Sequence, residues 1–279
     1  MISVEEALEK ILANVAVLKP EEKPILEYLG QVLAENVYSS FDIPPLDNSA
    51  MDGYAVRSAD TLGASETNPR ELQVIGEVAA GYIFQGAVGA GQAVRIMTGA
   101  PVPEGADAVV QYEETSEGRG QAWKGAEKGA RIAIFLEATP GLHVRRAGED
   151  IAAGALVLQR GTVLRPQEIG VLASLGRARA WVIRRPVVSI LATGDELVEV
   201  GQPLGPGQIH NSNSYSIASQ VSKYGGIPRL LGIARDNLSD LQAKIELGLQ
   251  GDMLLTSAGV SVGEYDIVRD VLAKQGEIG

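Results

Sequence analysis

The sequence predicts a multidomain protein in which an α/β domain with a parallel sheet accompanies a smaller, mainly-β domain. At 279 residues, the chain is longer than a single hydrophobic core usually grows, so about two domains or more are expected. After Arg185, three apolar runs alternate with helical patterns, and this order is typical of a parallel sheet covered by helices. Between Phe41 and Asp150, short apolar stretches alternate with Gly, Pro and Asp/Asn turns, which indicates a β-rich domain.

Helical patterns are found on both sides of the β-rich region. Ser3 begins a capping box, and apolar residues then recur at helical spacing over residues 4–15. A second helix is predicted over residues 24–34, because Pro24 suits the first turn of a helix. A further helix is predicted over residues 166–175, where Gly176 ends it.

The β-rich region carries four predicted strands, each bounded by turn residues. They cover residues 72–78, 93–96, 108–111 and 131–135, and two further short strands are predicted within 154–164. The Gly- and charge-rich segment 115–130 is predicted to be an exposed loop. Together these patterns predict a helical/β linker domain of residues 1–46 plus 151–183, a β-rich domain of residues 47–150, and an α/β domain of residues 184–279.

In the α/β domain, a polar cluster follows each of three predicted strands. The strands cover residues 187–192, 230–234 and 253–255, and the clusters cover residues 193–196, 235–237 and 256–266. Helices are predicted over 215–224 and 238–249, and a third over 267–272. Because ligands of an open parallel sheet bind at the C-terminal ends of its strands, the three clusters predict a binding site along one edge.

Composition excludes several classes of function. The chain contains no cysteine, which excludes disulfides and thiolate metal sites and fits a cytoplasmic protein. Two histidines are too few for a zinc site built on imidazoles. A net charge of −11 argues against a broad nucleic-acid interface, which needs a basic face. No apolar run approaches the ~18 residues of a membrane span, so no membrane association is expected.

The segment from Ser257 to Gly263 alternates small residues with glycines at a predicted strand end, just before a helix. Glycine permits close approach of a ligand to the backbone, and free N–H groups at a helix N-terminus bind anions. The alternative is a tight turn that simply requires small residues. Asp266, in the first turn of the helix, either complements the helix dipole or binds a cation together with the anion.

Carboxylates also follow the other two strands of the α/β domain. Taken singly, Asp195, Glu196 and Asp236 are explained by helix caps and turns. Gathered along one edge, they form an oxygen-rich site suited to Mg²⁺, which prefers a few carboxylates plus substrate phosphate oxygens. The combined pattern is therefore more specific than any of its members.

Polar clusters also occur in the β-rich region. Asp52 precedes Gly53 in a hairpin signal, and Thr98 stands beside a glycine at a predicted strand end. Arg145 and Asp150 belong to a cluster of two arginines and two carboxylates. Arginine suits bidentate recognition of oxyanions, although a surface ion-pair cluster explains the same residues.

Six segments of the chain resemble the motifs of the MoeA family. They occur in family order and cover the chain from end to end: DNSAMDGYAV (47–56), RIMTGAPVPEGADAVV (95–110), RRAGEDI (145–151), ATGDEL (192–197), GQI with the following NSN (207–213) and SAGVSVGEYD (257–266). Members of this family are molybdopterin molybdenumtransferases, and the gephyrin C-terminal domain is a relative. The resemblance implies that the α/β domain is a molybdopterin-binding, MogA-like domain.

The resemblance also implies a reaction, in which molybdenum from molybdate is inserted into adenylated molybdopterin and AMP is released with the assistance of Mg²⁺. Carried over to this sequence, it implies catalytic roles for Asp52, Thr98, Asp150, Glu196, Asp236 and Asp266. We expect substrate binding by Arg145, Thr193, Gly194, Ser257, Gly259, Ser261 and Gly263, and Mg²⁺ binding by Asp236 and Asp266.

The resemblance further implies an elongated homodimer, in which the β-rich domain of one subunit faces the α/β domain of the other and the two share an active site. Molybdopterin adenylyltransferase and molybdoenzyme apoproteins are the expected partners. The family continues with a lysine- and proline-containing oxyanion motif and a C-terminal β domain, so this chain is expected to be truncated, which would leave it inactive alone. Asn211 stands where relatives often carry Asp.

Two other functions compete with this interpretation. A nucleotide-dependent oxidoreductase would need G-x-G-x-x-G after the first strand of the α/β domain, where the chain has Thr193 to Glu196 instead. A non-catalytic molybdopterin-binding carrier or scaffold is compatible with the same motifs. Release of AMP separates the enzyme from the carrier.

Overall fold

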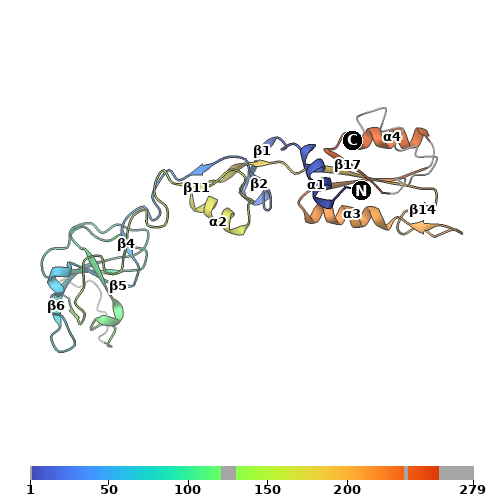
Figure 1. Cartoon of the computed structure of the whole chain (residues 1–279). Coiled ribbons are helices and arrows are strands. Elements are labelled where there is room, and N and C mark those ends of the chain that lie inside the picture. The colour runs from blue at the N-terminus through green and yellow to red at the C-terminus, as the bar shows by residue number, and fades with distance from the viewer. Residues whose placement is uncertain (1, 121–129, 236–237, 258–279) are drawn as a thin grey trace. The chain divides into compact units, whose positions relative to one another are not determined.

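The computed structural model describes residues 2–120, 130–235 and 238–257 of the chain, and these residues divide into two compact units (Figure 1). One unit is continuous and spans Asn36–Leu158. The other is built from the flanking segments, Met1–Glu35 and Gln159–Gly279. The β-rich unit is therefore an insertion within the sequence of the other unit, while the predicted three-domain boundaries remain predictions.

Helix α1, Val4–Ala13, begins at the capping box that the sequence predicts. The Ser3 hydroxyl accepts from the Glu6 backbone N–H at 3.1 Å, and the Glu6 carboxylate accepts from the Ser3 backbone N–H at 3.0 Å. Two backbone donors that the helix itself cannot satisfy are thereby paired. None of the α1 residues is buried among the described residues of the chain.

The second predicted helix, over residues 24–34, is wrong. The structure has strand β1 (Pro20–Pro24), a 3₁₀ turn η1 (Ile25–Glu27) and strand β2 (Val32–Leu33). Both strands pair antiparallel with β12 (Arg179–Ile183), in the order β1-β12-β2. Gly30 has φ +79°, which interrupts a helix, and the pairing of β2 with a strand about 150 residues away outweighs the local helical spacing.

The predicted helix near residue 170 is confirmed as α2, Pro166–Ser174, and Gly176 follows its end with φ +71°. Between residues 154 and 164, the structure has a single named strand, β11 (Leu156–Leu158), which pairs with β3 (Val37–Tyr38). Val163 forms an isolated bridge with Val32 in place of the second predicted strand.

The β-rich unit is built on a five-stranded sheet in the order β8-β5-β7-β6-β9. The strands are β5 (Gly53–Val56), β6 (Arg70–Val78), β7 (Gln92–Ile96), β8 (Ala108–Gln111) and β9 (Arg131–Ile134). Two short strands, β4 (Asn48–Ser49) and β10 (Val144–Arg145), form a separate antiparallel pair, and 3₁₀ turns η2 (Ser58–Thr61) and η3 (Tyr112–Glu114) connect strands. Buried residues alternate along β6 and pack into apolar clusters on both faces of the sheet.

The α/β part has a parallel sheet in the order β16-β13-β17, as the sequence predicts. Its elements are β13 (Val187–Thr193), β14 (Leu197–Val198), β15 (Ile209–His210), α3 (Ser212–Lys223), β16 (Ile227–Ala234), α4 (Leu238–Gly248) and β17 (Met253–Ser257). Figure 1 shows α3 and α4 on opposite faces of this sheet. Because β16 and β17 lie on opposite sides of β13, two right-handed crossovers require this placement of the helices. The third predicted helix, residues 267–272, lies outside the described residues.

Candidate functional site

The polar segments that follow the three strands of the α/β sheet begin at one edge. In the register of the sheet, Thr193 lies beside Ala234 of β16, and Ala192 lies beside Ser257 of β17. The chain runs from the central strand β13 through α3 to β16 on one side, and then back through α4 to β17 on the other side, so the direction of the strand order reverses at β13. In open α/β sheets, ligands bind outside the carboxyl ends of the strands at such a switch point. The end of β13 is therefore the candidate binding edge.

Strand β13 ends in a tight turn at Gly194, which has φ +141°. A Cβ atom at this position would lie 2.4 Å from Oε2 of Glu196, so the carboxylate of Glu196 folds back against the glycine. Thr193 and Gly194 are buried, whereas Asp195 and Glu196 are exposed. The turn therefore combines a buried backbone at Thr193 and Gly194 with two exposed carboxylates at Asp195 and Glu196.

The turn is fixed to its neighbours by hydrogen bonds. The Gly194 N–H donates to the Ala234 carbonyl at 3.4 Å, and the Arg235 guanidinium donates to the Asp195 carbonyl at 3.3 Å. The first and second predicted clusters thus make direct contact at Asp195 and Arg235. Ser257 is the last described residue of the third cluster.

Five of the predicted site residues lie outside the described residues. These are Asp236, Gly259, Ser261, Gly263 and Asp266. Among the residues that the structure does describe, no group of three His, Asp or Glu side chains could hold a metal ion. The described residues thus give no support for Mg²⁺ binding, and the predicted roles of Asp236 and Asp266 as its ligands stay predictions.

The sequence did not predict the structural role of Asn211. It is almost fully buried and caps α3, where its Oδ1 accepts from the Ser214 backbone N–H at 3.3 Å. Asparagine caps a helix as well as aspartate does, so the cap needs no charge at this position.

In the β-rich unit, Asp52 and Thr98 are in direct contact. The Thr98 backbone N–H and hydroxyl both donate to Oδ1 of Asp52, at 2.7 and 2.8 Å. These two donors lower the pKa of the Asp52 carboxyl, the backbone N–H more than the hydroxyl. Asp52 is therefore an ionised, exposed acceptor whose position is fixed by the end of β7.

Arg145 and Asp150 form a second contact, with Nη2 of Arg145 2.6 Å from Oδ2 of Asp150. The side chains are 42% and 51% exposed, so the surface ion-pair interpretation describes this arrangement and leaves the guanidinium open to solvent. A parallel ion pair joins Arg146 to Asp47 at 2.5 Å. The Ala147 N–H, followed by Arg146, lowers the pKa of Asp47.

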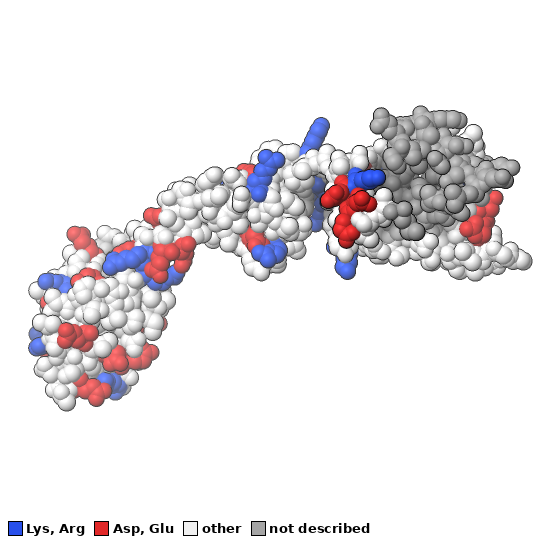
Figure 2. Space-filling view, in the orientation of Figure 1, with Lys and Arg blue, Asp and Glu red and all other residues white. Residues whose placement is uncertain are grey.

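Strand β4 connects these two pairs of residues. Asn48 lies beside Arg145 in the β4–β10 ladder and forms a bridge with Pro101 on its other side. The Ser49 carbonyl accepts from the backbone N–H of Gly99, the residue directly after Thr98, at 2.8 Å. The predicted residues of the β-rich unit are thus brought to one region around β4. Figure 2 shows acidic and basic side chains interspersed over the face of this unit in view.

The sequence prediction missed a buried ionic cluster behind Asp52. Thr115 and Glu117 are buried, so the prediction that 115–130 is wholly an exposed loop is wrong. Oε2 of Glu117 accepts from the Tyr54 hydroxyl at 2.5 Å, and Arg95 donates to both carboxylate oxygens at 2.9 and 3.2 Å. Burial, followed by the contact with Glu117, raises the pKa of Tyr54. Nothing in the polar run around Glu117 signals this burial, which follows from its contacts with Tyr54 and Arg95 on other strands.

The fold and its polar edge define the class of the chain: an α/β ligand-binding protein with an inserted β-rich unit. Comparison with known proteins narrows this class. Residues 2–176 match the sequence profile of the "MoeA N-terminal region (domain I and II)", and residues 189–278 match a "probable molybdopterin binding domain". The chain belongs to the MoeA family, as its six motifs predict.

Relatives with a curated name support this assignment. The chain is 39% identical to molybdopterin molybdenumtransferase 2 of Mycobacterium tuberculosis, over 97% of this chain and 64% of that protein. It is 41% identical to molybdopterin molybdenumtransferase of Nostoc sp., over 88% and 55%, and 37% identical to that of Bacillus subtilis, over 99% and 63%. The chain thus spans less than two thirds of the length of these relatives.

Solved structures share the fold. Two structures of the molybdopterin biosynthesis MoeA protein from Pyrococcus horikoshii match with TM-scores of 0.80 and 0.81, at 36% and 35% identity. They cover 99% and 92% of this chain, and the match spans 67% and 66% of their own chains. The predicted fold class, α/β combined with a β-rich domain, is confirmed. No helix among the described residues is both long and apolar enough to cross a membrane.

Proposed function

We propose that the protein acts in molybdenum cofactor biosynthesis as a molybdopterin molybdenumtransferase. It would insert molybdenum from molybdate into the dithiolene of adenylated molybdopterin and release AMP. The observation that carries the proposal is the switch point of the α/β sheet, where Thr193 and Ser257 end adjacent strands in a family named for this chemistry. The two dithiolene sulfurs belong to the substrate, so the reaction needs no protein nucleophile.

We propose that the substrate phosphate binds the glycine-containing loop that starts at Ser257, through backbone N–H groups. Thr193 and Gly194 would line the opposite side of that site. In the β-rich unit, the exposed guanidinium of Arg145 would bind an oxyanion such as molybdate, with Asp150 holding it in place. Asp52, whose lowered pKa keeps it ionised, would accept a proton or a hydrogen bond from a substrate group.

We further propose that the protein is a cytoplasmic homodimer that requires Mg²⁺, with Asp236 and Asp266 as its ligands. The ion would supply charge neutralisation at the phosphate that leaves with AMP. Molybdopterin adenylyltransferase would deliver the substrate, and molybdoenzyme apoproteins would accept the product. Chelation with EDTA should abolish AMP release and added Mg²⁺ should restore it; release that survives chelation contradicts the metal requirement.

The reaction is tested by incubating the full-length product of the reading frame with adenylated molybdopterin and molybdate, and measuring AMP. Asp52→Asn and Glu196→Gln should each reduce release at least tenfold, while Glu246→Gln on the exposed surface of α4 should not. Binding of the substrate by the wild type without any AMP release would instead favour the carrier. Unchanged release in both site variants would refute the assigned roles.

The shared active site has a separate test, because Asp52 and Glu196 belong to different units of the chain. If each site combines the β-rich unit of one subunit with the α/β unit of the other, a mixed dimer of the two single variants contains one intact site. Random mixing of Asp52→Asn and Glu196→Gln chains should then recover about a quarter of the wild-type activity. Sites contained within one subunit would show no recovery.

A further inference from the structure

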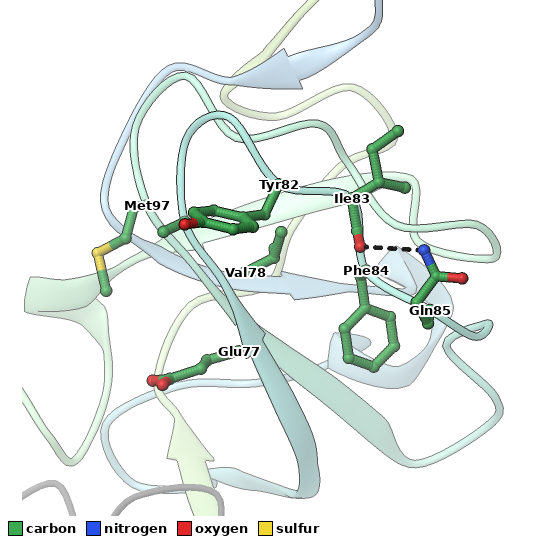
Figure 3. Close-up of a pocket in the computed structure, with 8 residues that line it drawn as sticks. Glu77, Val78, Tyr82, Ile83, Phe84, Gln85 and Met97 are labelled. Carbon is green, nitrogen blue, oxygen red and sulfur yellow. Dashed lines mark hydrogen bonds between the residues drawn. The ribbon is translucent and has the colours of Figure 1, made fainter.

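The β-rich unit contains a hollow of about 500 Å³ outside the residues assigned so far. It is lined by Glu77, Val78, Ala79, Tyr82, Ile83, Phe84, Gln85 and Met97 (Figure 3). Its volume lies within the range of small-molecule sites, which combine apolar walls with a few polar groups. We propose that this hollow binds the planar, amino-bearing heteroaromatic ring of the substrate, an inference that rests on the proposed function.

Two aromatic side chains form the walls of the hollow. Phe84 packs against Gly76, where a Cβ atom would lie 2.6 Å from Cε2 of the ring, so the glycine makes room for it. Tyr82 is 72% exposed, and Figure 3 shows its ring above Val78. Gly81, with φ +86°, turns the chain just before Tyr82. Aromatic faces and apolar side chains of this kind stack on planar rings.

The polar groups of the hollow select for donors on that ring. Among the described residues that line it, Glu77 is the one with a charge, and none is lysine, arginine or histidine. Glu77 is exposed, and its carboxylate accepts hydrogen bonds when ionised, which suits amino and ring N–H groups and disfavours a phosphate. Gln85 lies at the other side, with its amide donating to the Ile83 carbonyl at 3.5 Å (Figure 3).

The hollow is joined to the proposed reaction site through the backbone. Met97 lines the hollow, and its N–H donates to the Val78 carbonyl at 3.1 Å. The next residue, Thr98, donates twice to Asp52. A ring bound in the hollow would thus contact Met97, the residue directly before the Thr98 that binds Asp52. Adenine and the pterin are both bicyclic, amino-bearing rings of the adenylated substrate, and both present the chemistry that the hollow recognises.

Calorimetric titration of the full-length protein with three probes tests the inference. The probes are AMP, neopterin monophosphate, and ribose 5-phosphate, which has no ring of this kind. We expect Tyr82→Ala to weaken binding of at least one ring-bearing probe about 5- to 150-fold and to leave ribose 5-phosphate unchanged. Tyr82→Phe should retain binding, and Glu77→Gln should weaken it. Tyr224→Ala is the matched control, because Tyr224 is 81% exposed at the C-terminal end of α3 and belongs to the unit that does not contain the hollow.

The outcomes separate the two rings and the two proposals. Weakening of AMP alone assigns the hollow to adenine, and weakening of the pterin alone assigns it to the pterin. The inference is overturned if neither ring-bearing probe binds the wild type more tightly than ribose 5-phosphate, or if Tyr82→Ala and Glu77→Gln bind all probes as the wild type does. AMP release measured on the same variants reports on the proposed function separately, since release can persist when the ring site is refuted.

Discussion

Replacing Glu117 with alanine should destabilise the β-rich unit by about 4 kcal/mol, because Glu117 is the shared acceptor of a buried ionic cluster. Its carboxylate accepts two hydrogen bonds from Arg95 and one from the Tyr54 hydroxyl. The Glu117 side chain is 8% exposed and that of Arg95 21%, and Tyr54 is fully buried. The substitution would leave a largely buried guanidinium without its carboxylate.

The magnitude follows from the cost of each lost partner. Breaking a buried ion pair by removing one member costs roughly 3–5 kcal/mol, and the residual exposure of Arg95 places this pair at the lower end. Loss of the carboxylate acceptor of Tyr54 adds about 1 kcal/mol or more. Adding Tyr54→Phe to the Glu117→Ala background should therefore recover about 1 kcal/mol, because it removes the buried hydroxyl that lost its acceptor.

Urea unfolding followed by circular dichroism measures these free energies of unfolding. Glu66→Ala is the matched control, since Glu66 pairs with Arg119 but is 77% exposed, and its loss should cost no more than about 1 kcal/mol. A Glu117→Ala change that is as mild as the control would refute the reasoning. It would mean that the cluster is solvated in solution and that segment 115–130 is the exposed loop that its composition indicates.

Three further predictions concern substitutions at single residues. Gly53→Ala should destabilise the protein by about 3 kcal/mol or more, because the new Cβ would lie 2.0 Å from the backbone oxygen of Val110. An unchanged unfolding midpoint would contradict the register of β5. Gly170→Ala should stabilise the protein by about 0.5–1 kcal/mol, since Gly170 lies in α2 and no atom outside the helix would be near the new Cβ. Destabilisation would contradict the helical conformation of this segment. The Arg184 guanidinium, followed by the Val187 N–H, lowers the pKa of Asp252 to about 2, so this contact stabilises the fold above pH ~4 and is lost as the pH falls towards 2. Unfolding curves of the wild type and Asp252→Asn should therefore converge near pH 2, and a constant difference down to that pH would contradict the contact.

Patterns with a fixed period or a local cap were predictable from the sequence. The apolar runs at residues 187–192, 230–234 and 253–255 became the parallel sheet, because strands of a parallel sheet with helices on both faces read as continuous apolar segments. Ser3 and Gly176 marked the boundaries of α1 and α2, since caps are short-range interactions.

Long-range pairing was not predictable in the same way. The segment 24–34 has helical spacing, yet it folds as strands and a turn because β12 pairs with both β1 and β2. Glu117 is polar and surrounded by polar residues, and its burial follows from contacts with Tyr54 and Arg95 on other strands. The candidate site shows the same division: the motifs identified Asp52 and Thr98, but their direct contact follows from the fold.

The insertion of residues 36–158 is closed by the ladder between β3 and β11, where Leu156 lies opposite Tyr38. The polypeptide therefore enters and leaves this unit at adjacent points. A module with such neighbouring ends can be excised, grafted into a surface turn of an unrelated scaffold, or circularly permuted without straining its sheet. Recombination between relatives can likewise exchange residues 36–158 as one segment. The surface of this unit can therefore diverge independently of the flanking sequence.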